Sequence, residues 1–190
     1  MAEVKGRFIL ILDAMVSRRA QQKARAAMKI PIIDIKPGQW YTFKDTVLLY
    51  ERAIANVNGG LTDLKVTGAR IMPTLKKHTN ELDIFANPQQ LLMAFNALFL
   101  SDNRGPDAGH FKAIEMTATY AVMEDTSPHL PEFHLGVLEG AVGIFPGCSL
   151  ISSEIVERGS DKRVYKLTWK TREPPAPIVC TKGPTDQVPS

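Results

Sequence analysis

The chain has 190 residues, of which 44% are hydrophobic and 23% charged, and its net charge is +3. This length suits one domain with an apolar core of its own, so no metal or disulfide is needed to stabilise it. The nearly balanced charge argues against a nucleic-acid partner, and no apolar run approaches the ~18 residues of a membrane span. Cys148 and Cys180 are far apart and in no metal-ligand spacing, which favours a reduced, cytoplasmic setting.

The first half of the chain is predicted to be helical. Strong helix formers follow the apolar start of residues 6–28, which we expect to form one helix, although that start could also be a strand. After a proline-containing connector, Thr42 is placed to cap a helix that ends at Asn58-Gly59-Gly60. Thr62 is placed to cap a further helix that runs to about Leu75.

The second half changes from helical to alternating periodicity. Asn87-Pro88 is a typical helix start, with a capping residue before a proline. From Phe111 to Met123 apolar residues alternate with polar ones, which predicts a strand with one buried face. Glu132–Phe145 is predicted to be a helix, and Cys148–Val156 and Val164–Trp169 are predicted to be strands joined by a hairpin connection.

These elements predict an α/β protein of the α+β type, in which N-terminal helices pack on a small antiparallel sheet. Its C-terminal unit is expected to be strand–helix–strand–strand. Gly136, Gly140 and Gly143 lie inside the predicted helix of this unit, where each costs about 1 kcal/mol relative to Ala. We expect them to allow close approach to a sheet, another helix or a ligand.

The proline content divides the chain at about residue 170. Residues 1–170 are predicted to form a single domain. Residues 171–190 are rich in proline and poor in large apolar side chains, so we predict an extended or disordered tail.

Motifs that carry catalysis are nearly absent from the sequence. It has no phosphate-binding loop, no nucleophile elbow and no zinc-hydrolase motif. His129, Glu132 and His134 could bind a metal, but their spacing does not match a helical ligand pair, so no metal site is predicted. An acid–base site would need His134, Glu115 and Glu154 to converge, whereas both strand carboxylates are expected on the solvent face. An enzyme is the less favoured function, and no catalytic residue is assigned.

A series of short motifs extends along most of residues 5–169. It consists of Lys5-Gly-Arg-Phe8, Trp40-Tyr41, Gly68-Ala-Arg70, Asn87-Pro-Gln-Gln-Leu-Leu92, Thr117-Ala-Thr-Tyr-Ala-Val122, Gly136 with Glu139-Gly140, and Tyr165-Lys-Leu-Thr-Trp169. In this order they resemble the superfamily of 4-vinyl-reductase-type ligand-binding domains, heme-NO-binding domains and TRAPP transport subunits. The resemblance implies an α/β domain whose helices and sheet enclose a hydrophobic cavity for aromatic effectors, acyl chains or heme.

Three features of that superfamily are missing at the corresponding positions. The heme-NO-binding branch carries a proximal histidine on the helix before the sheet, where this chain has Phe99. The zinc-containing vinyl-reductase-type sensors have a cysteine cluster near the final hairpin, but residues 158–163 contain no cysteine. TRAPP subunits often acylate a cysteine near the N-terminus, and no cysteine precedes Cys148 in this sequence.

We predict a small-molecule-binding or sensor module that uses an apolar cavity. Its effector would be a small apolar or aromatic molecule, and its output would need a homodimer or a separate signalling partner. The candidate lining combines apolar side chains with two polar handles, His134 and Tyr120. It consists of Trp40, Tyr41, Phe95, Phe99, Tyr120, His134 and Leu138.

Two alternatives remain open. The chain could be a homodimeric scaffold or assembly subunit whose helices are solidly packed and hold no ligand. It could also be a heme-binding sensor with a non-standard iron ligand, supplied by His134, His129 or His78. The preferred interpretation predicts no cofactor, and heme is the less favoured alternative.

Overall fold

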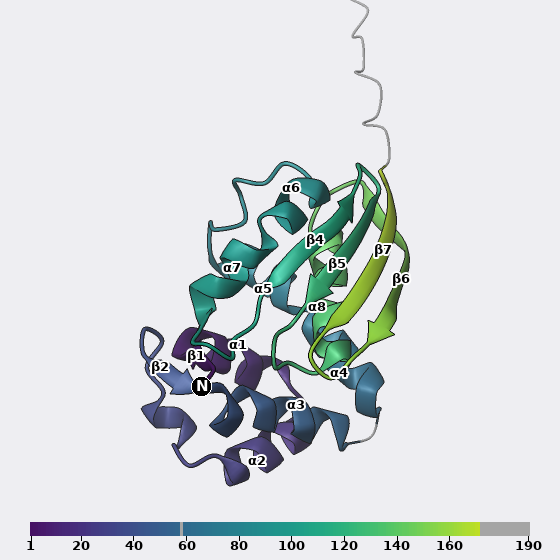
Figure 1. Cartoon of the computed structure of the whole chain (residues 1–190). Helices are drawn as coiled ribbons and strands as arrows, with labels where there is room; N and C mark the ends of the chain where they lie inside the picture. Colours follow the sequence, from purple (N-terminus) through teal and green to yellow (C-terminus); the bar gives the residue numbers. More distant parts are fainter. Residues whose placement is uncertain (58, 172–190) are drawn as a thin grey trace, which may run out of the picture.

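The computed structural model describes residues 1–57 and 59–171. It confirms the predicted α+β class, with a group of helices at one end and an antiparallel sheet crossed by a long helix at the other (Figure 1). The N-terminal part contains β1 (Glu3–Lys5), α1 (Gly6–Met15), α2 (Arg18–Ala27), β2 (Trp40–Thr42) and α3 (Val47–Ala55). The middle part contains α4 (Gly60–Ala69), α5 (Ile71–His78), α6 (Pro88–Met93), α7 (Phe95–Asp102) and β3 (Asn103–Arg104). The C-terminal part contains β4 (Phe111–Met116), β5 (Tyr120–Asp125), α8 (Pro131–Gly143), β6 (Cys148–Arg158) and β7 (Arg163–Thr171).

The larger sheet has the strand order β4-β5-β7-β6, and each neighbouring pair is antiparallel. The segment predicted as one strand is a hairpin, because the Thr117 N–H donates to the Tyr120 carbonyl at 2.8 Å and closes a turn. Alternation alone did not reveal this turn, since the apolar period continues on both sides of it. The C-terminal unit is therefore hairpin–helix–hairpin, with the predicted first strand extended by a second one.

The predicted helix over residues 6–28 is interrupted after α1. The Ser17 hydroxyl accepts the Ala20 N–H at 3.4 Å and caps α2. The buried Asp13 pairs with Arg25 at 2.6 Å, although 12 residues of straight helix would separate them by about 18 Å. The turn between the helices thus gives a buried carboxylate its partner, which a single straight helix could not do.

Two further predicted helices differ from those of the structure. Trp40–Thr42 pairs with β1 as a strand, so α3 begins only after Thr46. The helix predicted from Thr62 is divided into α4 and α5, and Pro73 lies in the first turn of α5, where a missing N–H is tolerated. The start at Asn87 is confirmed, because its side chain accepts the Gln90 N–H at 2.9 Å.

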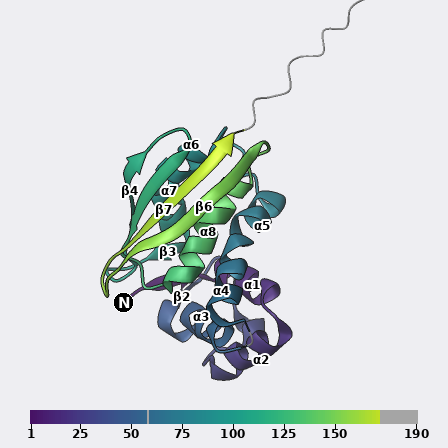
Figure 2. The same cartoon turned by 90° about the vertical axis from the view of Figure 1, so that its right-hand side faces the viewer.

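Glycines allow α4 and α8 to cross with their backbones in contact (Figure 2). A Cβ atom added at Gly136 would lie 2.0 Å from the Lys65 carbonyl oxygen, and one at Gly140 would lie 2.5 Å from that of Ala69. The prediction that these glycines permit close approach is confirmed for another helix. Gly143 differs, since a Cβ atom there would meet nothing within 4 Å.

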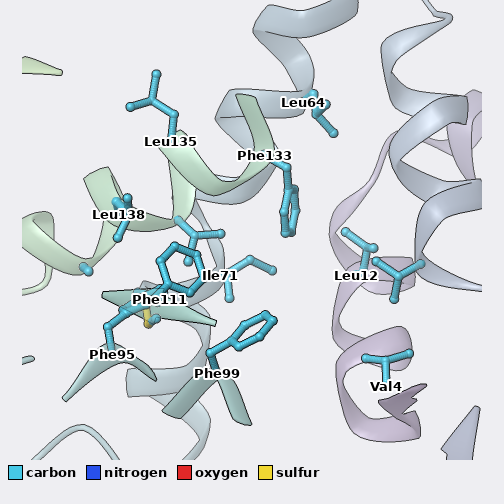
Figure 3. Packing of buried hydrophobic residues seen from close by; sticks show 14 of the residues in the cluster. Val4, Leu12, Leu64, Ile71, Phe95, Phe99, Phe111, Phe133, Leu135 and Leu138 are labelled. Carbon is cyan, nitrogen blue, oxygen red and sulfur yellow. The ribbon is translucent and has the colours of Figure 1, made fainter. Parts of the chain in front are cut away.

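The apolar core lies between the sheet, α8 and the N-terminal helices. Its aromatic part gathers side chains from α7, β4 and α8 that face α1 (Figure 3). Within the described residues, no helix is long and apolar enough to cross a membrane. The predicted tail falls almost wholly outside the described residues, which end at Thr171 in β7.

Candidate functional site

A cavity of about 60 Å³ lies between α1, α5, α7 and the N-terminal half of α8. Apolar side chains make up most of its wall, and two imidazoles interrupt it (Figure 3 shows several of the apolar ones). The lining consists of Phe8, Ile71, Met72, Leu75, Glu81, Leu82, Phe95, Leu98, Phe99, Ser101, Asp102, Asn103, His129, Phe133, His134 and Val137. An apolar wall with a few convergent polar groups is typical of a small-molecule site.

His134 is held by a carboxylate at the end of β5. Its Nδ1 atom lies 2.9 Å from an Asp125 carboxylate oxygen and 3.1 Å from the Ser127 hydroxyl. The same carboxylate accepts the Ser127 N–H at 2.7 Å and the Tyr165 hydroxyl at 3.1 Å. Because every partner donates to Asp125, the carboxylate acts as an acceptor throughout and orients the imidazole.

The electrostatics of this pair favour a neutral ring beside an ionised carboxylate. Burial alone would raise the pKa of Asp125, but His134 and the Ser127 N–H outweigh it and hold that pKa at about 2. Burial lowers the pKa of His134, and the neighbouring His129 adds to this effect, together outweighing Asp125. His134 is therefore neutral at neutral pH, which is the form of an imidazole that binds a metal.

His129 is held in the same way by a carboxylate of α3. Its Nδ1 atom bonds to one oxygen of Glu51 on α3, whose second oxygen accepts the Leu130 N–H at 2.8 Å. The ring lies in an aromatic box, stacked on Phe133 at 5.5 Å between ring centroids and 4.2 Å from His134. Glu51 and His129 are 0% and 1% exposed, so the pair is sealed from water.

Two arginines fix the segments around the cavity. Arg163 of β7 donates to the Ser127 and His129 carbonyls and so holds the segment between β5 and α8 that carries His129. At the rim, Arg7 of α1 bonds Asp102 and Glu81, each at 2.6 Å. The site is thus bordered by the Arg7 ion pairs and the Arg163 hydrogen bonds, which all join parts of the chain that are distant in sequence.

The arrangement does not match a hydrolase triad. Ser127 and Asp125 both approach Nδ1 of His134, whereas a nucleophile and its orienting carboxylate occupy opposite ring nitrogens. Glu115 and Glu154 are exposed on the outer strands, so the acid–base cluster that the sequence left open does not form. Among the described residues, no group of three or more His, Cys, Asp or Glu side chains could hold a bare metal ion.

Some of the residues predicted to line the cavity meet there, and others lie elsewhere. Phe95, Phe99 and His134 line it. Leu138 is fully buried but belongs to the core beside the cavity. Trp40 and Tyr41 lie on the small sheet β2-β1-β3, where Trp40 stacks under Arg104 at 4.3 Å and Tyr41 accepts the Lys36 N–H at 2.7 Å. Tyr120 is placed on β5 beneath the Lys166 amine at 5.7 Å.

The carboxylates of the site were missed by sequence reasoning. His129 was considered as a metal ligand beside Glu132 and as one of three candidate heme ligands, but Asp125 and Glu51 were not singled out. A signal for Glu51 exists, since it interrupts the apolar face of a helix between Val47 and Ile54. A charged residue in such a position needs a buried partner.

Comparison with known proteins identifies the fold. No family model matches the sequence, and no curated protein matches it either. Among solved structures, an H-NOX protein of S. oneidensis in the Fe(II) ligation state superposes with a TM-score of 0.69 at 16% identity, over 89% of this chain and 97% of that one. An oxygen-binding H-NOX domain related to soluble guanylate cyclases gives 0.65 at 17% identity, over 89% and 93%. A third structure, from work on heme distortion in the H-NOX family, gives 0.64 at 18% identity, over 89% and 93%.

These structures correct one prediction and confirm part of another. The fold is H-NOX-like, so the resemblance is confirmed at the level of the fold for its heme-NO-binding branch. The prediction of no cofactor is wrong as a starting point, because the structures that share this fold are described with Fe(II), oxygen or heme. The heme alternative thus has better support than the preferred interpretation.

The donor set of the cavity fits heme better than a bare metal ion. A bare transition metal needs three or four protein ligands, whereas a single protein side chain can hold the iron of heme. His134 lines the cavity as a neutral imidazole and bonds Asp125 through the nitrogen remote from a ligating Nε2. The volume of about 60 Å³ is well below the roughly 300–1,000 Å³ of pockets for drug-sized ligands. A porphyrin would therefore enter only as the aromatic side chains move outward.

Proposed function

We propose that the chain is a heme-binding sensor module in which a buried histidine of the cavity supplies the iron ligand. The observation that carries the proposal is the carboxylate-backed imidazole of His134, which lines a mostly apolar cavity. Metal-ligating histidines usually donate their other ring N–H to a carboxylate or carbonyl. The H-NOX-like fold supports the same function, since structures with this fold are described with Fe(II) and oxygen.

The chain's own residues would prepare the site for the cofactor. Asp125 orients His134, and Glu51 orients His129 as the second candidate ligand. The mostly apolar wall would keep water away from the iron, so that a small neutral gas could bind there instead of water. When bound, heme would supply an iron centre that can hold such a gas. A homodimer or a separate signalling partner would transmit the result.

Addition of heme to purified full-length protein tests this function. We expect a sharp Soret absorbance band that saturates at one heme per chain in the wild type. His134→Phe should abolish or strongly shift the band if His134 is the ligand, and His129→Phe should do so if His129 is. His78→Phe is the matched control, because His78 is exposed at the end of α5. A wild type that gives only the broad spectrum of free heme would overturn the proposal.

A second function rests on the size of the cavity. About 60 Å³ of apolar space suits a very small neutral molecule that binds without heme. Xenon pressure on crystals or on NMR samples tests it, and we expect shifts confined to residues such as Phe99, Phe133 and Val137. No shift at these residues would exclude this function.

A further inference from the structure

A cleft of about 170 Å³ lies between α4, the end of α3 and the turn that joins α1 to α2. We call it the α4 cleft. Its lining consists of Met15, Ser17, Ile54, Val57, Asp63, Val66, Thr67 and Arg70. None of these residues lines the cavity beside His134, so the α4 cleft is a separate site that the proposed function does not use.

The α4 cleft occupies the face of α4 that is turned away from α8. Four residues of α4 and its C-cap line it at intervals of three and four positions, which places them on one stripe of the helix: Asp63, Val66, Thr67 and Arg70. The opposite stripe packs on α8, since a Cβ atom added at Gly68 would lie 2.1 Å from the Phe133 carbonyl oxygen. α4 also contacts α3 (Figure 2), so one helix separates the packed core from the cleft.

Opposite charges stand at the two ends of this stripe and do not meet. Asp63 and Arg70 are seven positions apart, which is about 10 Å along a helix. Within residues 1–57 and 59–171, neither side chain makes an ion pair or a hydrogen bond. Both charges are therefore available to a ligand that lies along the stripe.

The wall between the two charges is apolar, apart from one hydroxyl group. Val66 is 45% exposed, and Met15 and Val57 are half-buried, so a ligand in the cleft would cover apolar surface that now contacts water. The Thr67 hydroxyl donates to the Asp63 carbonyl at 2.7 Å, which leaves its oxygen lone pairs free to accept a hydrogen bond. The acidic end of the cleft thus offers two acceptors, a carboxylate and a hydroxyl oxygen.

We propose that the α4 cleft binds a small zwitterion whose ammonium and carboxylate groups are separated by a short apolar stretch. The ammonium group binds Asp63 and the Thr67 oxygen, and the carboxylate binds the guanidinium of Arg70. The apolar stretch covers Val57 and Val66. An ω-amino acid or a short apolar peptide has this arrangement, whereas an α-amino acid carries both charges on one carbon atom and cannot span about 10 Å. The volume of about 170 Å³ limits the ligand to a size below that of typical drug-sized molecules.

Three probes of equal chain length test the need for both charges. 6-Aminohexanoate, hexanoate and hexylamine are titrated into full-length wild-type protein without heme, and the methyl NMR resonances of Ile54, Val57 and Val66 are followed. We expect 6-aminohexanoate to shift these resonances and to bind at least about tenfold more tightly than either single-charge probe, because each charge gains a charge-assisted hydrogen bond. Equal affinities for all three probes, or no shift with 6-aminohexanoate or with a short peptide, would overturn the proposal.

Two conservative variants assign the charges to the ends of the ligand. Asp63→Asn should weaken the binding of 6-aminohexanoate about tenfold and leave hexanoate unchanged, while Arg70→Gln should weaken 6-aminohexanoate and leave hexylamine unchanged. The unchanged probe shows in each case that the variant is folded. Asp161→Asn and Lys170→Gln are matched controls, because both residues are exposed on the β6–β7 side of the molecule, and neither should change any affinity. A uniform loss for all three probes in either cleft variant would contradict the assignment.

The dipeptide alanyl-leucine separates the two sources of such a ligand. Binding of 6-aminohexanoate alone would indicate a free ω-amino acid, and binding of alanyl-leucine alone would indicate a peptide. If neither binds, the proposal fails. Since every titration is made without heme, these results leave the proposed heme function untouched, and the absence of a Soret band would leave the α4 cleft untouched.

Discussion

Glu51 and His129 lie 78 positions apart in the sequence, yet their side chains form a hydrogen bond where neither is exposed to water. The bond joins α3, in the N-terminal group of helices, to the segment that leads into α8. The Leu130 N–H donates to the second oxygen of Glu51 and reinforces the connection. One carboxylate therefore links two halves of the chain beside the cavity and orients an imidazole in its wall.

Removal of this carboxylate should destabilise the whole fold. Glu51→Ala leaves His129 and the Leu130 N–H buried without a partner, which we expect to cost about 3–5 kcal/mol in urea unfolding. The control is Glu157→Ala, since Glu157 is exposed and pairs only with Lys162 at 3.2 Å. The control should cost less than about 1 kcal/mol. A loss as small in Glu51→Ala as in the control would show that the buried bond does not join the two halves.

Acid should weaken the fold through Asp125 and His134. The pKa of Asp125 is lowered to about 2 in the folded state, so its contribution is present above the unfolded value of about 3.9. The free energy of unfolding should fall by about 2–3 kcal/mol as the pH falls from about 5 through 2. The pKa of His134 is also lowered, so the unfolded chain takes up a proton below about 6.5 that the folded chain does not, and stability falls in that range too.

Unfolding free energies measured between pH 8 and pH 2 check this dependence. His134→Gln should flatten the part of the curve near pH 6, because glutamine can donate to Asp125 but does not titrate. His110→Gln serves as control, since His110 is half exposed on the loop before β4. An unchanged slope in His134→Gln would assign the acid sensitivity to other groups.

The helix crossing predicts opposite effects for two glycines of α8. Gly136→Ala places a methyl group where the Lys65 carbonyl lies 2.0 Å away, so we expect a loss of about 1–3 kcal/mol or more. Gly143→Ala meets nothing within 4 Å and should gain up to about 1 kcal/mol from helix propensity. Thermal unfolding of the two variants gives the comparison. Equal shifts in both would mean that α4 and α8 do not touch at Gly136.

Features that depend on neighbouring residues were predicted from the sequence, whereas features that depend on contacts between distant residues were not. The α+β class, the strands of the final hairpin and the helix start at Asn87 followed from periodicity and capping, which are local properties. The interruption after α1 did not, because it depends on the pairing of Asp13 with Arg25 across a turn. Helical phase predicted that Phe99 is buried and that His134 faces the interior, whereas the cavity that both of them line was implied by the family resemblance.

The carboxylates of the site could not be assigned to the imidazoles from the sequence. Asp125 lies nine positions before His134, with the loop of residues 126–130 and the start of α8 between them, and Glu51 reaches His129 from α3. Alternation predicts only which face of a strand is buried, and Asp125 is a polar residue on the buried face of β5. Such contacts depend on tertiary packing, which a periodic pattern in the sequence does not predict.

Phe99 lies in the wall of the cavity, and its removal tests the cavity directly. The side chain is 8% exposed and packs edge-to-face on Phe111 and both imidazoles. Phe99→Ala should cost about 3–5 kcal/mol, because it removes a buried ring and leaves an apolar space behind. An enclosed apolar space of this kind binds benzene. Benzene at about 100 times its Kd should therefore raise the free energy of unfolding of the variant by about 2.7 kcal/mol.

The control for this rescue is Phe85→Ala, which removes a half-buried ring outside the wall of the cavity. Benzene should raise the Tm of Phe99→Ala and leave that of Phe85→Ala unchanged, because only the first variant gains an enclosed apolar space. An equal rise in both would indicate nonspecific binding to the surface. Since a porphyrin needs more room than about 60 Å³, Phe99→Ala should also take up heme faster than the wild type, measured as the rate at which the Soret band appears.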